Sequence, residues 1–160
     1  VPEMTFSLTA GLNWKGFDFS VLLQGATRSS IYLQGDIAWD NSWGNYFEEH
    51  IGRWTPETAA TATYPRFTKA ATATHPNYYK SDYWLKDSKY LRLKNIQLGY
   101  TIPRKLLKKF GIRSLRVYTN AYNLLTWDNV KKVDPESPNN SNGQFYPQQK
   151  VINFGINLNF

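Results

Sequence analysis

Apolar and polar side chains alternate along five stretches of the chain. In the clearest stretch, residues 151–160, asparagines and a glycine alternate with Ile152, Phe154, Ile156, Leu158 and Phe160. Successive side chains of a β-strand point to opposite faces of the sheet, so a period of two predicts a strand with one apolar and one polar face. The same pattern predicts four more strands, at residues 5–14, 17–25, 90–102 and 114–123.

Two of the connections between these stretches are short. Lys15 and Gly16 separate the first two stretches, and a two-residue connection containing glycine predicts a tight hairpin turn. Farther along, Pro103 can open a helix, because its missing N–H would lack a partner there, and Gly111 can close one in the left-handed conformation. We therefore expect one or two helical turns over residues 104–110.

The third stretch contains a break in its alternation. Leu91 and Leu93 hold one phase, whereas Ile96 and the apolar residues after it hold the other. A phase slip at Lys94-Asn95 indicates a β-bulge, in which one extra residue re-aims the side chains that follow.

The lengths of the connections indicate the fold class. Residues 26–88 and 124–150 are long and rich in turn formers, in contrast to the two short connections. Outer-membrane barrels place short turns in the periplasm and long loops outside, and strands of about ten residues match a tilted bilayer crossing. The sequence therefore predicts an all-β fold, an antiparallel transmembrane β-barrel. Because a closed bacterial barrel has an even number of strands, we expect an odd number of strands before residue 1.

Composition leaves two alternatives open. Aromatic residues make up 16% of the chain and charged residues 19%, and no apolar run approaches the length of a membrane-spanning helix, which is about 18 residues. A soluble, aromatic-rich carbohydrate-binding β module is one alternative, although it would need a second apolar sheet that the pattern does not supply. A nonspecific porin is the other.

Basic residues account for a net charge of +7. Six of the 19 lysines and arginines fall in one short stretch: Arg104, Lys105, Lys108, Lys109, Arg113 and Arg116. A nucleic-acid surface would interleave basic and aromatic side chains on one face, so no nucleic-acid partner is expected. A solvated turn near anionic lipid headgroups is the favoured interpretation.

No catalytic or metal-binding constellation stands out. The chain has no Ser/His/Asp order, nucleotide-binding glycine pattern or convincing carboxylate pair, so neither enzyme activity nor a cofactor is expected. Cysteine is absent, and His50 and His75 lie too far apart to form a ligand set on one element, so no metal site is expected. Asp134 and Glu136 could offer oxygens to calcium, but their order departs from the EF-hand pattern.

Several segments, taken in order, resemble the carboxyl-terminal region of SusC/RagA-type outer-membrane proteins, which are TonB-dependent receptors. Each segment alone is a weak signal, but the ordered series spans nearly the whole chain. The segments are RWTPE (53–57), YPR (64–66), YLRLKNIQLGYTIP (90–103), SLRVYTNAYNLLTW (114–127), DPE (134–136) and the last strand ending in Phe160.

The resemblance implies a barrel of about 22 strands, plugged by an amino-terminal domain, of which this chain would be roughly the last quarter. It implies import of glycans, oligosaccharides or peptides across the cell outer membrane of a Gram-negative bacterium. A SusD-like surface lipoprotein would serve as lid, and the TonB complex would supply energy through a part of the protein outside this chain. The chain itself would contribute barrel wall, in contact with outer-membrane lipid, and extracellular loops.

The resemblance also implies a role for the last strand. Alternating apolar residues before a final aromatic residue resemble the signal by which the assembly machinery recognises unfolded barrels. The residues concerned are Phe154, Ile156, Leu158 and Phe160.

Residues 26–88 are rich in aromatic rings. Such rings stack on sugars or anchor a protein partner, because they bury much area while losing few rotamers. Alternatively, a long loop needs a small core of its own. Six rings are candidates for substrate or partner contact: Trp39, Trp43, Trp54, Tyr78, Tyr79 and Trp84.

Overall fold

The computed structural model describes residues 2–40, 46–69, 75–130, 133–137 and 145–160. The chain divides into two compact units. The sheet unit comprises residues 1–29, 89–129 and 148–160, and the loop unit comprises residues 30–88 and 130–147. Among the described residues, no helix has the length and apolarity needed to cross a membrane.

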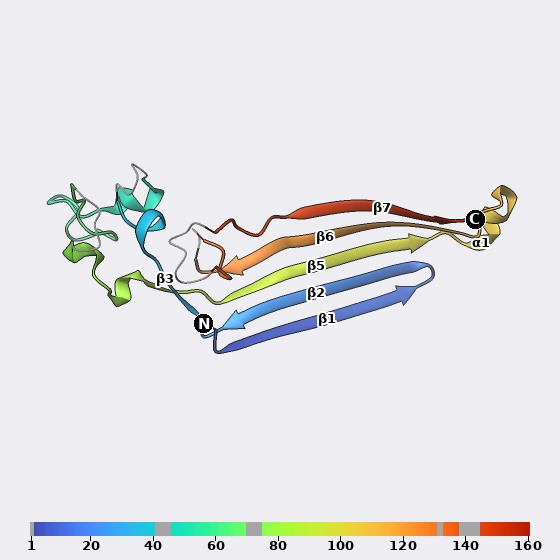
Figure 1. Ribbon diagram of the computed structural model, residues 1–160, viewed down its shortest axis with the longest axis horizontal. Helices are drawn as coiled ribbons and strands as arrows, with labels where there is room; N and C mark the ends of the chain where they lie inside the picture. The colour runs from blue at the N-terminus through green and yellow to red at the C-terminus, as the bar shows by residue number, and fades with distance from the viewer. Residues whose placement is uncertain (1, 41–45, 70–74, 131–132, 138–144) are drawn as a thin grey trace. The chain divides into compact units, whose positions relative to one another are not determined.

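The sheet unit is one antiparallel sheet of five strands in the order β1-β2-β5-β6-β7 (Figure 1). The strands are β1 (Met4–Trp14), β2 (Phe17–Thr27), β5 (Tyr90–Thr101), β6 (Ser114–Asp128) and β7 (Val151–Asn159). Within the sheet each strand lies beside its predecessor, which is the up-and-down arrangement of a barrel wall. The antiparallel β fold expected from the alternation is confirmed for this part of the chain.

The largest difference from the predicted strand boundaries is at the end of the fourth strand. The fourth was expected to end at Asn123, and residues 124–150 were expected to form a loop, but β6 continues to Asp128. Asn123 has a positive φ of 51°, which interrupts the alternation. Beyond this irregularity the ladder resumes, with Leu125 opposite Leu93 and Trp127 opposite Leu91.

The predicted bulge in β5 is confirmed. Leu93 lies opposite Leu23 and Asn95 lies opposite Leu22, so Lys94 is the extra residue. Because one residue is inserted, the apolar side chains on both sides of the bulge reach the same face of the sheet.

The cross-strand register gathers the apolar residues on one face. Directly opposed residues of antiparallel strands share a face, so each row of partners can be followed from strand to strand. One row contains Leu8, Leu23, Leu93 and Leu125. A second contains Trp14, Phe17, Tyr100, Val117 and Ile156. We call the side of the sheet that carries these rows the apolar face and the opposite side the polar face.

Both short connections have the predicted form. Lys15 and Gly16 have φ values of 47° and 91°, and two successive positive values are typical of the turn that matches the twist of a two-residue hairpin. Between β5 and β6 lie a helical turn, α1 (Arg104–Leu107), and a 3₁₀ turn, η5 (Lys108–Phe110). Gly111 ends them in the left-handed conformation, with φ of 70°.

The loop unit has short elements where residues 26–88 were expected to form a connection. Strands β3 (Ser30–Tyr32) and β4 (Leu85–Asp87) pair antiparallel. The 3₁₀ turns are η1 (Gly35–Ile37), η2 (Glu48–Gly52), η3 (Pro76–Tyr78) and η4 (Asp82–Trp84). These elements surround a small core, so the interpretation that the long loop packs on itself is confirmed. The buried core residues are Ile31, Leu33, Ala38, Tyr64, Tyr78, Trp84 and Val130.

Candidate functional site

The apolar face of the sheet unit exposes many large apolar side chains, which is unfavourable in water. On its edge strands, Leu12 and Leu8 of β1 are 63% and 61% exposed, and Phe154 and Ile156 of β7 are 83% and 69% exposed. Burying one such side chain is worth about 1.5–3 kcal/mol, so a face of this composition is stable only against an apolar medium or an apolar partner.

The polar face carries an ion pair that spans three strands. Asp18 of β2 accepts hydrogen bonds from Arg116 of β6, at 2.9 Å from Nε and 2.5 Å from Nη2. Gly99 of β5 lies beneath the pair, and a Cβ atom there would collide with both groups. The glycine therefore makes room for a two-pronged bond that ties β2 to β6.

The polar face is also hydrogen-bonded toward its β7 edge. The Asn153 amide donates to the Asn120 side chain at 2.9 Å, and Asn159 donates to Ser114 at 2.7 Å. The ring of Tyr118 covers Gly155, its partner on β7, and leaves no space for a side chain there. The asparagines that alternate along β7 are thus structural partners of β6.

Arg92 is the most deeply buried charged side chain of the sheet unit, at 2% exposed. Its Nε donates to the Thr126 hydroxyl at 3.0 Å, and its guanidinium lies over the Tyr90 ring at 5.5 Å from the centroid. Register places Arg92 on the polar face, beside Gln24 of β2. A charge held this way is consistent with a face that does not contact lipid.

Asp40 is the centre of the loop-unit core and is fully buried. It accepts hydrogen bonds from the Tyr78 hydroxyl and, at 2.9 Å, from the backbone N–H of Thr68. Its own N–H donates to the Tyr64 oxygen at 3.0 Å. Burial, with the Asp40 carboxylate nearby, raises the pKa of both Tyr64 and Tyr78, so both phenols keep the protons that they donate.

His50 belongs to the same core. It is 2% exposed, and its Nδ1 accepts the Phe47 N–H at 3.1 Å. This bond assigns the ring proton to Nε2, which lies 3.3 Å from the Ala38 carbonyl and donates to it. Within the described ranges, no group of three or more His, Asp or Glu side chains is placed to hold a metal ion.

The six aromatic candidates have different positions. Tyr78 and Trp84, each 3% exposed, are core residues, and Trp39 packs against them with its ring 4.8 Å from that of Tyr78. Trp43 lies outside the described residues. Trp54 and Tyr79 are 38% and 55% exposed, so these two rings are accessible to a ligand or partner.

A pocket of about 310 Å³ adjoins one of the accessible rings. It is lined by Arg53, Trp54, Thr55, Pro56, Arg66 and Phe67. The Arg53 guanidinium lies over the Phe67 ring at 4.9 Å from the centroid. Two guanidinium groups beside aromatic rings suit a ligand that combines an oxyanion with a flat apolar surface. From the sequence, RWTPE and YPR contribute only to the resemblance, because six residues separate the two motifs and nothing local shows that they line one pocket.

The proposed assembly-signal residues lie along β7 and at the end of the chain. Phe160 is 74% exposed and Leu158 is 43% exposed. With Phe154 and Ile156 they form a regular apolar row along β7, and among the described residues β7 pairs on one side only, with β6. Such a row can be read by a partner that adds a strand to the free edge.

The sequence is similar to curated TonB-dependent receptors. It is 29% identical over 176 residues to TonB-dependent receptor P26 of Formosa agariphila, covering 100% of this chain and 17% of that protein. It is 24% identical over 165 residues to TonB-dependent receptor SusC of Bacteroides thetaiotaomicron, covering 99% of this chain and 15% of that protein. No family model matches the sequence.

The fold is similar to parts of two solved structures of RagAB. One is the RagAB peptide importer in the "open-open" state, with a TM-score of 0.78, 25% identity, and coverage of 100% of this chain and 17% of that chain. The other is the RagAB peptide transporter, with a TM-score of 0.77 and 98% of this chain covered. The chain therefore spans about one sixth of the length of its relatives. These likenesses confirm the resemblance drawn from the sequence: the chain is similar to part of the SusC/RagA-type TonB-dependent receptors.

Proposed function

We propose that this chain forms part of the wall and extracellular loops of a plugged outer-membrane β-barrel. The barrel imports large nutrients, glycans or peptides, with energy from the TonB complex and a SusD-like lipoprotein as lid. The observation that carries the proposal is the apolar face, which runs continuously over all five strands.

The dimensions of the strands support a membrane crossing. β1 and β2 have 11 residues each and β5 has 12. At about 3.3 Å per residue and a tilt of about 45°, strands of this length cover the apolar band of an outer-membrane barrel, about 25 Å tall. The polar face would then line the lumen or contact the plug.

The outer edges of β1 and β7 support closure by further strands. In the part of the chain that the structure describes, β1 and β7 are each paired on one side only. An open strand edge exposed to lipid would leave backbone groups without hydrogen bonds, which a membrane does not tolerate. A closed barrel of about 22 strands would pair both edges.

The loop unit supports a role in contact with the lid or the nutrient. Its buried rings pack against one another in the core. Of the six candidate rings, Trp54 and Tyr79 are the described ones that remain accessible for recognition. Trp54 shares its pocket with Arg53 and Arg66. We assign to this pocket contact with the nutrient or lid, and to the β7 row recognition by the barrel-assembly machinery.

Uptake by native cells tests the proposed function. A strain that lacks the receptor is compared with its parent for uptake of labelled oligosaccharides and oligopeptides, and free sugars and amino acids that pass porins serve as the control. We expect the strain to lose uptake of one of the large classes and to keep uptake of the small molecules. Unchanged uptake of every large nutrient would contradict the proposal.

A further inference from the structure

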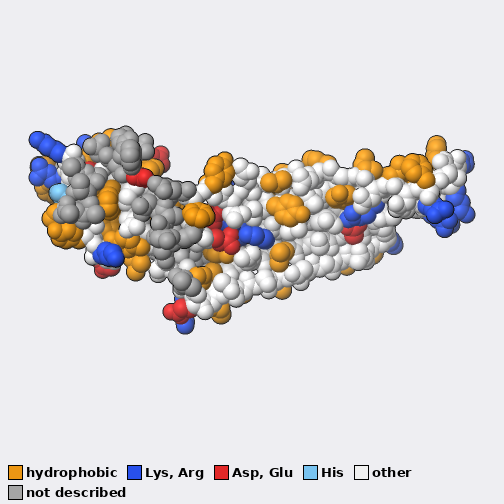
Figure 2. Space-filling view, in the orientation of Figure 1, with side chains coloured by type: hydrophobic (Ala, Val, Ile, Leu, Met, Phe, Trp, Pro, Cys, Tyr) orange, Lys and Arg blue, Asp and Glu red, His pale blue; other side chains and the backbone are white. Residues whose placement is uncertain are grey.

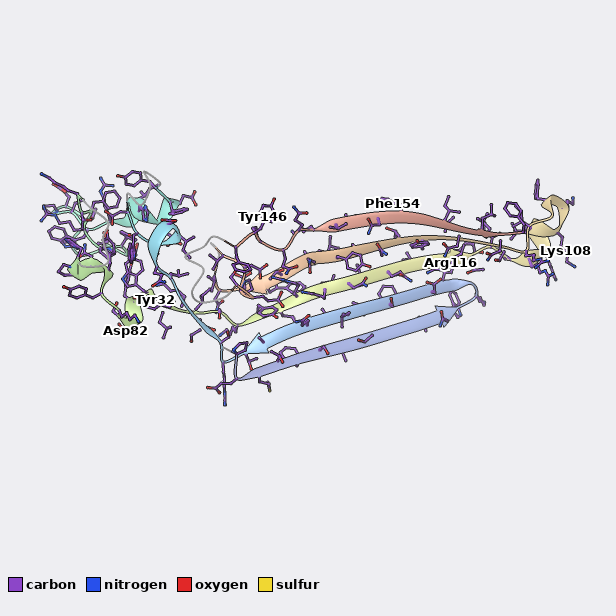
Figure 3. The ribbon with its side chains drawn as sticks, viewed as in Figure 1. Tyr32, Asp82, Lys108, Arg116, Tyr146 and Phe154 are labelled. Carbon is purple, nitrogen blue, oxygen red and sulfur yellow. The ribbon has the colours of Figure 1, made fainter. Side chains whose placement is uncertain are left out.

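The connection between β5 and β6 carries the densest charge of the sheet unit. No acidic residue lies between Thr101 and Trp127. Within the described part of the chain, no carboxylate pairs with the basic side chains of this connection. Figure 2 shows them as a blue patch at one end of the sheet, and Figure 3 labels Lys108 there. The five residues are Arg104, Lys105, Lys108, Lys109 and Arg113.

The charged and apolar side chains of α1 and η5 lie on different sides of the turn. Residues three or four positions apart share one side of a helix. Lys105 and Lys109 share a side by this spacing, and so do Leu106 and Phe110. Leu106 and Phe110 are 65% and 74% exposed, whereas Leu107 is 5% exposed. The turn is therefore a short amphipathic element with an exposed apolar side.

Backbone hydrogen bonds hold this turn at a fixed level of the sheet. The Ile102 N–H donates to the Leu115 carbonyl at 2.9 Å, which closes the β5–β6 hairpin. The Arg113 N–H donates to the Asn159 carbonyl at 2.8 Å, which ties the turn to the end of β7. The buried Leu107 side chain adds a third attachment.

A row of aromatic residues lies at the end of the sheet next to this turn, as at a membrane–water interface. Trp14, Phe17 and Tyr100 occupy the last row of the apolar face before the short turns, and the rings of Phe17 and Tyr100 lie 4.5 Å apart. Thr101 donates to the Gly16 carbonyl at 2.7 Å, so the two short turns lie at the same end. Aromatic girdles mark the boundary between hydrocarbon and headgroups in membrane barrels. Along the apolar face, the aliphatic rows at the middle of the sheet give way to aromatic rings, first Phe19 and Phe154 and then Trp14, Phe17 and Tyr100, and the cations follow in the turn.

We propose that this turn is a docking site for anionic phospholipid headgroups of the leaflet on the short-turn side. The lysines and arginines meet lipid phosphates, and Leu106 and Phe110 insert at the boundary with the acyl chains, as in interfacial amphipathic helices. The inference rests on the proposed function, because it needs the apolar face in a bilayer. The inference adds that the turn binds anionic phospholipids in preference to neutral ones, which an apolar barrel wall alone would not do.

The test uses the whole receptor, reconstituted in vesicles of phosphatidylcholine with phosphatidylglycerol and then extracted in mild detergent. Mass spectrometry of the extracted receptor counts the lipids that it retains. One variant replaces Lys105, Lys108 and Lys109 with Gln. The matched control replaces Lys69, Lys80 and Lys150 with Gln, so that both variants lose the same charge.

We expect the wild type and the control to retain phosphatidylglycerol in preference to phosphatidylcholine. The turn variant should retain at least about fivefold less phosphatidylglycerol, since each basic residue near an anionic surface contributes a factor of roughly five. Equal retention in the turn variant and the wild type would overturn the inference. Equal loss of phosphatidylglycerol in both variants would also overturn the inference, because the net charge of the receptor would then explain its lipid retention.

A gel shift on heating separates this inference from the proposed function. Folded outer-membrane barrels migrate differently before and after boiling. If the wild type shows the shift and lipid retention is unchanged in the turn variant, only the lipid site is wrong. If the wild type shows no shift and is absent from the outer membrane, the proposed function itself fails.

Discussion

The sheet unit and the loop unit place their apolar side chains in opposite ways. In the loop unit, Tyr78 and Trp84 are each 3% exposed within a common core. In the sheet unit, Leu12 and Phe154 are 63% and 83% exposed on one face. In the loop unit the apolar groups leave water by packing inward, whereas in the proposed barrel those of the sheet unit would leave water by facing lipid. The comparison shows that one unit covers its apolar side chains by itself, whereas the other leaves them exposed and needs an apolar medium or partner to cover them.

Removing a core ring should destabilise the loop unit and leave the sheet unit folded. Trp84→Ala should lower the free energy of unfolding of the loop unit by about 3–5 kcal/mol, because it leaves a cavity among buried rings. Limited proteolysis of the folded receptor should show faster cleavage within residues 46–69, while the heating shift of the barrel persists. The half-exposed Trp54→Ala is the control and should cost far less.

A charge introduced on the apolar face should destabilise the sheet unit. Ile96 belongs to an apolar row near the middle of β5, between Val21 and Ala121, whereas Gln97 is on the polar face. Ile96→Arg should destabilise the barrel by about 2–4 kcal/mol if this row lies near the bilayer midplane. Gln97→Arg is the matched control. Equal folding yields of the two variants in vesicles would contradict lipid contact at this face.

Breaking the polar-face ion pair should have a smaller effect. Asp18→Asn removes the negative charge that Nε and Nη2 of Arg116 bind. Because the side chains of Asp18 and Arg116 are 26% and 24% exposed, solvent screens part of the lost interaction. We expect a cost on the order of 1–2 kcal/mol in denaturant unfolding of the receptor. The exposed Asp82→Asn in the loop unit should change this unfolding transition little.

Alkaline pH should lower the stability of the loop unit through its two buried tyrosines. The pKa values of Tyr64 and Tyr78 are raised in the folded loop unit, so their contribution to stability is present below about pH 10, the ordinary value, and declines as the pH rises above it. Tyrosinate absorbance should reveal phenols that titrate late. Tyr78→Phe should remove one late phenol, and a titration unchanged by this variant would contradict the Asp40 network.

The sequence predicted the sheet well because its signals are local. A period of two located β1 and the phase slip located the bulge at Lys94, since both depend on neighbouring residues only. The end of β6 escaped prediction because Asn123 interrupts the alternation before Leu125 and Trp127 resume it. Only the pairing with β5 shows that the strand continues.

The candidate sites were harder to predict because their partners are distant in sequence. Asp18 and Arg116 are 98 residues apart, and the role of Gly99 beneath them requires the register of three strands. Asp40 meets Tyr78 from 38 residues away, and no periodicity marks such a network. Counting aromatic residues identified the ring-rich segment but could not separate the core ring Trp84 from the accessible ring Tyr79.

The proposed function requires the apolar face to contact outer-membrane lipid as part of a large barrel. The most direct test is an immunoblot of fractionated native cells with an antibody against residues 53–63, with each sample run with and without boiling. We expect a band of the size of a whole plugged barrel, found in the outer-membrane fraction and shifting on heating. A soluble band near 18.5 kDa, the size of this chain, would contradict it.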